Sequence, residues 1–336
     1  MPRLATCGCR ALCVTPAKPR MALIKELRAL TSAPMKNCVS ALKESGGDLE
    51  EAVVLLRKSG LAAAKKKATR GADEGAIALA HGPDGLAVVE ISSETDFVAR
   101  NEIFQRLAVD VARTALAQAA PAAQGGAVDV LETEVLGASA LAGGATSVSD
   151  ALGHAVGTLG ENLVLRRACV LRPAPEGGAL VGYVHNSYSE GVGRTAAAVS
   201  LRSATPKVDE LRALGQKLAM HVVASKPAYL DRAAVPEAVL ARERDIFREQ
   251  AAAEYRESGK PQKMVDHIVE GRLKKLFYSE ACLLEQEYVI EDSAGSVAKV
   301  LQAAGAELGA EVSLEGFVRY HIGEGAAAKA EGAADA

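Results

Sequence analysis

The stretch that organises this chain is LAVVEISSETDFVARNEIFQRL, residues 86–107. Its first six residues are mostly apolar and predict a buried strand. An apolar repeat with helical spacing begins near the end of this stretch and continues beyond it, and it consists of Ile103, Phe104, Leu107, Val111 and Leu116. A polar break separates the two elements, so Asp96 and Phe97 lie on a short turn between them. Asn101 is a natural N-cap for the helix, because its side-chain oxygen can accept a backbone N–H of the first turn.

Asp96 and Phe97 have no evident structural duty in this turn. An arbitrary pair of this kind more often plugs the local core and caps a turn than binds a partner. A large apolar side chain offered from a fixed junction could instead contribute about 1.5 to 3 kcal/mol on entering a partner's pocket, which is the scale of a binding hot spot. Both interpretations stay open at the level of this turn alone.

The composition narrows the class of protein. The chain has 336 residues, which is long for one compact core and predicts two or three domains. Lys and Arg total 39 against 42 Asp and Glu, so no general basic field attracts nucleic acid, and binding to tRNA or ribosomal RNA is disfavoured. No apolar run approaches the roughly 20 residues that a membrane span needs, so we expect no contact with a membrane.

The six cysteines do not predict a metal site. Cys7, Cys9 and Cys13 lie close together, but no His or fourth Cys follows at ligand spacing. The other three are far apart and odd in number, so buried reduced thiols are expected at Cys38, Cys169 and Cys282.

Residues 22–62 predict three short helices. Each has an apolar face, formed in turn by Leu23, Leu27 and Leu30, by Met35, Val39 and Leu42, and by Leu49, Val53 and Leu56. Asp48 and Glu51 have the spacing of a capping box for the third helix, and Gly60 is expected to end it. A linker is expected at residues 63–75.

The remainder of the chain predicts an α+β fold. Two antiparallel hairpins are expected, each followed by a helix, at Ile77–Ala80 with Leu86–Ile91 and at Val181–His185 with Ala197–Leu201. The repeated order of strand, strand and helix suggests an internal duplication that builds two α+β subdomains, residues 76–172 and 173–323. Within the first subdomain, residues 117–149 are rich in Ala, Gly and Ser, and we expect a flexible connection around a short helix.

The second subdomain contains a predicted helical hairpin at residues 235–277, with a break near Gly259–Pro261. Its apolar stripe could form ordinary core or a coiled coil through which two copies self-associate. The tail, residues 324–336, has low complexity and is expected to be disordered.

The octet Thr95–Glu102 resembles the signature of the elongation factor Ts family. Other stretches resemble that family in the same order along the chain, namely Gly160–Asn162, His221 with Ala224–Pro227, Val269–Leu273 and Cys282–Gln286. The resemblance runs from about Leu23 to Gly323. It implies that the three helices form a ubiquitin-associated-like (UBA-like) domain and that the helical hairpin is the family's coiled-coil element.

The resemblance implies a guanine-nucleotide exchange factor for the translation GTPase elongation factor Tu, which it binds in the GDP form and in the nucleotide-free form. It implies that a set of four residues presses into the GTPase, displaces elements that hold magnesium and promotes GDP release, namely Thr95, Asp96, Phe97 and Val98. Further contacts that it implies are Arg28, Met35, Arg100, Asn101, His221 and Ser225. No catalytic residue, metal site, cofactor or direct contact with nucleic acid is expected, so the protein is not expected to be an enzyme.

Residues 1–21 resemble an organelle transit peptide. The first twenty carry four basic residues and no acid, and the first carboxylate of the chain is Glu26. Asn186–Glu190 stands where the family usually has a Gly-rich turn, a departure associated with organellar members. We therefore expect a protein of the mitochondrial matrix, with the plastid as the alternative.

A second departure from the family pattern is one added residue between Arg272 and Cys282. An added residue turns a helix by about 100°, so the resemblance does not fix the packing of the last helix.

Two other classes of function remain open. A non-catalytic scaffold would use the three helices and the helical hairpin to bind partners, and Phe97→Ala would then lower stability. An enzyme would need a set of titratable residues that converge across the two subdomains.

Overall fold

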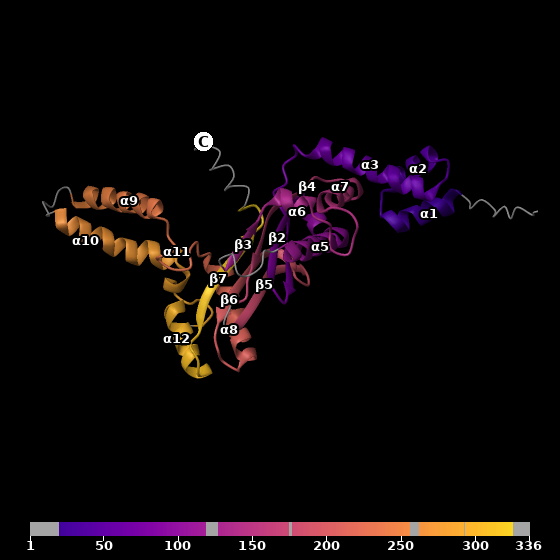
Figure 1. The fold of residues 1–336 in the computed structure, drawn as a ribbon. Coiled ribbons are helices and arrows are strands. Elements are labelled where there is room, and N and C mark those ends of the chain that lie inside the picture. Colours follow the sequence, from indigo (N-terminus) through magenta and orange to yellow (C-terminus); the bar gives the residue numbers. More distant parts are fainter. Residues whose placement is uncertain (1–19, 119–126, 175–176, 256–261, 292, 325–336) are drawn as a thin grey trace, which may run out of the picture.

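The computed structural model describes residues 20–118, 127–174, 177–255, 262–291 and 293–324 (Figure 1). The predicted transit peptide and tail lie almost entirely outside these residues, as does the predicted break near Gly259–Pro261. The described chain runs from three helices at one end, through a central sheet, to a projecting pair of helices at the other end (Figure 1). None of the described helices is both long and apolar enough to cross a lipid bilayer.

The three predicted helices are present as α1 (Arg20–Thr31), α2 (Met35–Glu44) and α3 (Leu49–Lys67). Asp48 caps α3 as predicted, because its carboxylate accepts the backbone N–H of Glu51 at 3.0 Å. Apolar faces of the three helices meet in a small core whose buried members include Ile24, Leu27, Cys38, Leu42 and Leu56.

The sequence predicted that α3 ends at Gly60, but the helix continues to Lys67. It crosses α7 (Val148–Leu159), and Gly60 lies at the crossing. A Cβ atom on Gly157 of α7 would lie 2.6 Å from the Cα atom of Gly60, so Gly157 has no room for a side chain, and a Cβ atom on Gly60 would lie tightly, at 3.2 Å, against the carbonyl oxygen of Gly153. Gly60 is therefore a point of close helix contact, and the predicted linker is helical up to Lys67.

The central sheet is antiparallel and, in the described residues, has seven strands. These are β1 (Glu74–Gly82), β2 (Gly85–Ser93), β3 (Val128–Leu131), β4 (Leu163–Leu171), β5 (Gly178–Ser189), β6 (Val192–Arg202) and β7 (Ser313–His321). Both predicted hairpins are confirmed, as β1–β2 and β5–β6. Pairing of Ile77 with Gly193 and of Ala78 with Val192 joins them, so the two halves of the chain share one sheet.

Each hairpin is covered by its own helices. Helix α5 (Glu102–Gln118), together with α6 (Thr133–Ala138) and α7, packs over β1, β2 and β4 in a first core cluster. Helices α8 (Val208–Ser225) and α12 (Val297–Leu308) cover β5, β6 and β7 in a second cluster. A third cluster joins the two halves of the sheet through side chains such as Ile77, Leu86, Leu171 and Val318. Cys38, Cys169 and Cys282 are buried free thiols, as predicted.

The projecting pair is the predicted helical hairpin, formed by α9 (Glu237–Tyr255) and α10 (Gln262–Arg272). Phe247 of α9 packs against Val265 and Val269 of α10, so part of the apolar stripe is internal core. The chain continues through a π-helical turn at Leu273–Tyr278, then α11 (Ser279–Ala281) and a 3₁₀ turn at Leu283–Glu285. A π turn holds more residues than an α-helical turn, and this one lies within the stretch in which the sequence analysis expects one added residue.

Candidate functional site

The Asp96–Phe97 turn is a one-turn helix, α4 (Asp96–Ala99), between β2 and α5. Val98 and Ala99 are buried in the first core cluster and anchor the turn. Phe97 points the other way and is 79% exposed, more than any other large apolar side chain in the described residues. The interpretation in which Phe97 plugs the local core is therefore wrong.

The start of α5 confirms the predicted cap. The side-chain oxygen of Asn101 accepts the backbone N–H of Ile103 at 2.9 Å. Its backbone carbonyl also accepts the N–H of Gln105 at 3.0 Å, the first hydrogen bond of the helix. Asn101 thus fixes the direction in which the chain leaves the turn.

Asp96 lies beside Phe97 in a network of exposed charges. Its carboxylate is 3.7 Å from the guanidinium of Arg100, one helical turn later. Arg100 in turn lies 5.0 Å from the ring centroid of Tyr188, near the end of β5. Exposed ion pairs of this kind contribute little to stability, so Asp96 can exchange its partner at small cost when another molecule binds.

Val98 and His221 are both buried in the free chain, so a direct contact of either with a partner would require a movement of the residues that cover it. Val98 is 8% exposed because it faces the core beneath α4. His221, on α8, is fully buried. Its Nδ1 atom accepts the backbone N–H of Val289 at 3.3 Å, and its Nε2 atom lies 3.0 Å from the side-chain oxygen of Gln286. The sequence could not distinguish these inward positions from outward ones on the same elements.

Ser225 belongs to the same buried network as His221. Its hydroxyl is 3.4 Å from Nδ1 of His221, and its carbonyl accepts the side-chain amide of Gln286 at 3.1 Å. Both residues therefore tie α8 to the segment that follows the helical hairpin. They lie on α8, which covers the half of the sheet formed by β5, β6 and β7. Helix α4 lies at the other half, which α5 covers.

We predict that His221 makes the stability of the protein depend on pH. Burial lowers the pKa of His221 below its ordinary value of 6.5 and outweighs the hydrogen bond to Gln286, which raises it. The unfolded chain binds a proton at His221 more readily than the folded protein does. The contribution of neutral His221 to the free energy of unfolding is therefore complete above pH 6.5 and is lost as the pH falls through the lowered pKa of the folded state.

The measurement is urea unfolding of wild type and His221→Gln at several values between about pH 5 and about pH 8. Burial also lowers the pKa values of His81, His154 and His321, so the difference between the two proteins isolates His221. The wild type is expected to lose more free energy of unfolding on acidification than the variant. Equal losses would contradict this assignment.

The remaining predicted contacts lie on the three-helix domain. Arg28 is exposed in the last turn of α1, and Met35, the first residue of α2, is 51% exposed. Leu30 was assigned to the buried face of α1, but it is 67% exposed. Leu30 and Ile103 line a groove of about 510 Å³ between this domain and helices α5 and α7. The three-helix domain and α5 thus offer apolar side chains to the same open space.

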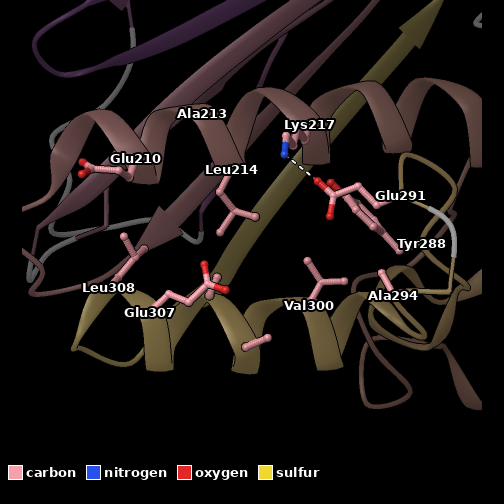
Figure 2. A pocket seen from close by; sticks show the side chains of 12 residues that line it. Glu210, Ala213, Leu214, Lys217, Tyr288, Glu291, Ala294, Val300, Glu307 and Leu308 are labelled. Carbon is pink, nitrogen blue, oxygen red and sulfur yellow. Dashed lines mark hydrogen bonds and ion pairs between the residues drawn. The ribbon is translucent and has the colours of Figure 1, made fainter.

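A second hollow, of about 380 Å³, lies between α8 and α12 (Figure 2). Its rim carries Glu210, Glu291 and Glu307, and the ammonium of Lys217 lies 2.5 Å from the carboxylate of Glu291. The Tyr288 hydroxyl has no hydrogen-bond partner, but its oxygen is buried, so a molecule in the hollow would not reach it without a side-chain movement. Across the described residues, no group of three or more His, Cys, Asp or Glu is placed to hold a metal ion.

Comparison with known proteins shows which family the chain belongs to. The family model described as Elongation factor TS matches residues 94–324, which include α4 and most of the sheet. The chain is 44% identical over 304 residues to the elongation factor Ts of Paramagnetospirillum magneticum, covering 90% of this chain and 91% of that protein. It is 45% identical over 307 residues to the protein of the same name from Maricaulis maris, covering 90% and 92%. The corresponding protein of Rhodospirillum rubrum is 44% identical over 307 residues, with the same coverage.

Proposed function

Because this chain belongs to the elongation factor Ts family, we propose that it is a guanine-nucleotide exchange factor for elongation factor Tu and makes no covalent bond change. The observation that carries the proposal is Phe97, which is 79% exposed on a turn whose next two residues are buried. An apolar side chain held in this way loses little conformational freedom on entering a pocket, so most of its burial energy remains available for binding.

Asp96 and Phe97 act as a wedge in this proposal. They press against the GTPase near its nucleotide-binding helices and displace elements that hold magnesium. Without the cation, the diphosphate of GDP loses its main counter-charge and leaves. Exchange needs no acid, base or nucleophile. It requires only that the factor bind the nucleotide-free GTPase more tightly than the GDP form.

Four of the other candidate residues form two groups. Arg28 and Met35, exposed on the three-helix domain, grip the GTPase directly. His221 is buried and Ser225 is half-buried, and they support a second contact by fixing the segment around Gln286. Substitution of Arg28 or Met35 is therefore expected to weaken binding alone. Substitution of His221 or Ser225 is expected to lower the stability of the protein as well as its binding.

The proposal is tested by thermodynamic reciprocity. If the chain weakens GDP binding, GDP must weaken binding of the chain by the same factor. Titration calorimetry should show affinity for nucleotide-free elongation factor Tu at least about tenfold tighter than for the GDP form. Equal affinities would identify a scaffold instead.

The scaffold remains the second candidate because the helical hairpin projects from the body (Figure 1) and exposes Ile246, and Leu276 is exposed on the π-helical turn that follows it. Self-association through this surface would appear as a concentration-dependent mass in analytical ultracentrifugation. Replacement of both side chains by Ser would abolish it.

We also propose that the protein acts in the mitochondrial matrix, on the strength of its basic, acid-free first twenty residues. Fluorescent fusions to the full chain and to a chain without residues 1–21 test this. Mitochondrial signal that depends on those residues supports it, and plastid or diffuse signal contradicts it.

A further inference from the structure

We propose that Glu161 is a positioning residue for the wedge formed by Asp96 and Phe97. Glu161 follows α7 and lies 66 positions along the chain from Thr95. One of its carboxylate oxygens accepts the backbone N–H of Thr95 at 2.9 Å, and the other accepts the Thr95 hydroxyl at 2.6 Å. This inference rests on the proposed exchange function.

Thr95 stands at the N-cap position, directly before α4, but its side chain makes no capping hydrogen bond to that helix. Its backbone is extended, with φ −132° and ψ 159°, and its hydroxyl is directed to Glu161. Hydrogen bonds to a carboxylate are shorter and stronger than those between neutral groups. Glu161 therefore fixes the start of α4, while Val98 and Ala99 fix its end in the core. Phe97 lies between these two anchors.

A third hydrogen bond lies beside these two. The carboxylate of Glu94 accepts the backbone N–H of Asn162 at 2.7 Å. Residues 94 and 95 are thus bonded to residues 162 and 161, so the end of β2 is clamped to the turn after α7 from both sides. These bonds hold Glu94 and Thr95, the two residues that connect β2 to α4.

The same turn is bonded to the three-helix domain. The ammonium of Lys67, at the end of α3, donates to the carbonyl of Gly160. The side-chain amide of Asn162 donates to the carbonyl of Arg70 at 2.9 Å, and the guanidinium of Arg70 lies 3.5 Å from Glu94. Residues 160–162 therefore connect the wedge to the domain that we propose grips the GTPase. Glu161 therefore sets the position of Phe97 relative to the three-helix domain.

The test uses the full chain with Glu161→Ala, Glu161→Gln and the control Glu132→Ala, an exposed glutamate that makes no side-chain cap at α6. Release of fluorescent GDP from elongation factor Tu is measured over a range of factor concentrations. We expect Glu161→Ala to lower the maximal release rate about tenfold and to change the half-saturating concentration much less, because the grip is retained. Glu161→Gln keeps one acceptor oxygen and is expected to be intermediate, and Glu132→Ala is expected to match wild type.

Hydrogen exchange of the free protein gives a second readout that does not depend on the GTPase. The backbone N–H groups of residues 95–97 should exchange faster in Glu161→Ala, with the rest of the sheet unchanged. A wild-type maximal rate in Glu161→Ala would overturn the inference, as would unchanged exchange at these residues. If wild type itself fails to accelerate GDP release, the proposed function fails instead. If Glu161→Ala does not fold, Thr95→Val removes the same hydroxyl bond, and Thr95→Ser should restore it.

Discussion

Phe97→Ala is expected to slow factor-dependent GDP release from elongation factor Tu by about 10- to 100-fold. The estimate follows from about 1.5 to 3 kcal/mol for burying a large apolar side chain, at 1.36 kcal/mol for each factor of ten. The side chain is 79% exposed in the free protein, so its removal leaves no cavity in the core. The melting temperature should therefore stay close to that of wild type.

Val130→Ala is the matched control for Phe97→Ala. Val130 is 71% exposed on β3, so this change also removes an exposed apolar side chain from a folded element. We expect wild-type GDP release from it. A Phe97→Ala protein that is fully active, or one that melts far below wild type, would contradict the role assigned to Phe97.

Gly157→Ala is expected to destabilise the contact between α3 and α7 by about 1 to 3 kcal/mol, the usual cost of forcing an added methyl group into a packed interface. The new Cβ atom would lie 2.6 Å from the Cα atom of Gly60, which is backbone and cannot rotate away. Helix α3 must therefore shift and carry the three-helix domain with it. We expect a higher half-saturating concentration of the factor in GDP release, because the three-helix domain and the wedge could then no longer contact the GTPase together in their original relative positions.

Gly271→Ala is the control for this substitution. Gly271 also lies in a helix, α10, but nothing surrounds its Cβ position within 4 Å. Ala at such a site should stabilise the protein by about 0.5 to 1 kcal/mol through helix propensity alone. Urea unfolding of both variants should thus give opposite signs. Destabilisation of equal size in both would show that the contact between α3 and α7 is not the cause.

The local elements around the wedge could be predicted from the sequence because their signals are local. The apolar strand, the polar break and the Asn101 cap all lie within residues 86–107, and each is found in the structure. The exposure of Phe97 and the burial of Val98 could not be separated in this way. Adjacent residues of a single helical turn have no period long enough to define a face.

Features that depend on distant partners were missed. Helix α7 is rich in small residues, and its burial requires α3, which lies about ninety positions earlier. Gly60 was interpreted as a helix end because glycine is common there, whereas its role here is close contact. The hydrogen bonds of Glu161 to Thr95 span 66 positions, and only the resemblance of Gly160–Asn162 to the family pattern marked that turn.

A π-helical turn lies between Arg272 and Cys282, in the stretch where the sequence analysis expects one residue more than the family pattern. The π-helical turn at Leu273–Tyr278 provides room for one added residue without a continuous rotation of the following chain. Cys282 and Leu283 remain buried, and Gln286 still reaches Ser225 and His221.

The most direct test of the account is the rate at which fluorescent GDP leaves purified elongation factor Tu in the presence of excess unlabelled GDP and increasing amounts of the full chain. We predict a release rate that rises with factor concentration, saturates well above the spontaneous rate, and falls back toward it with Phe97→Ala. A folded wild-type chain that binds the GTPase and leaves the release rate unchanged would contradict the central claim.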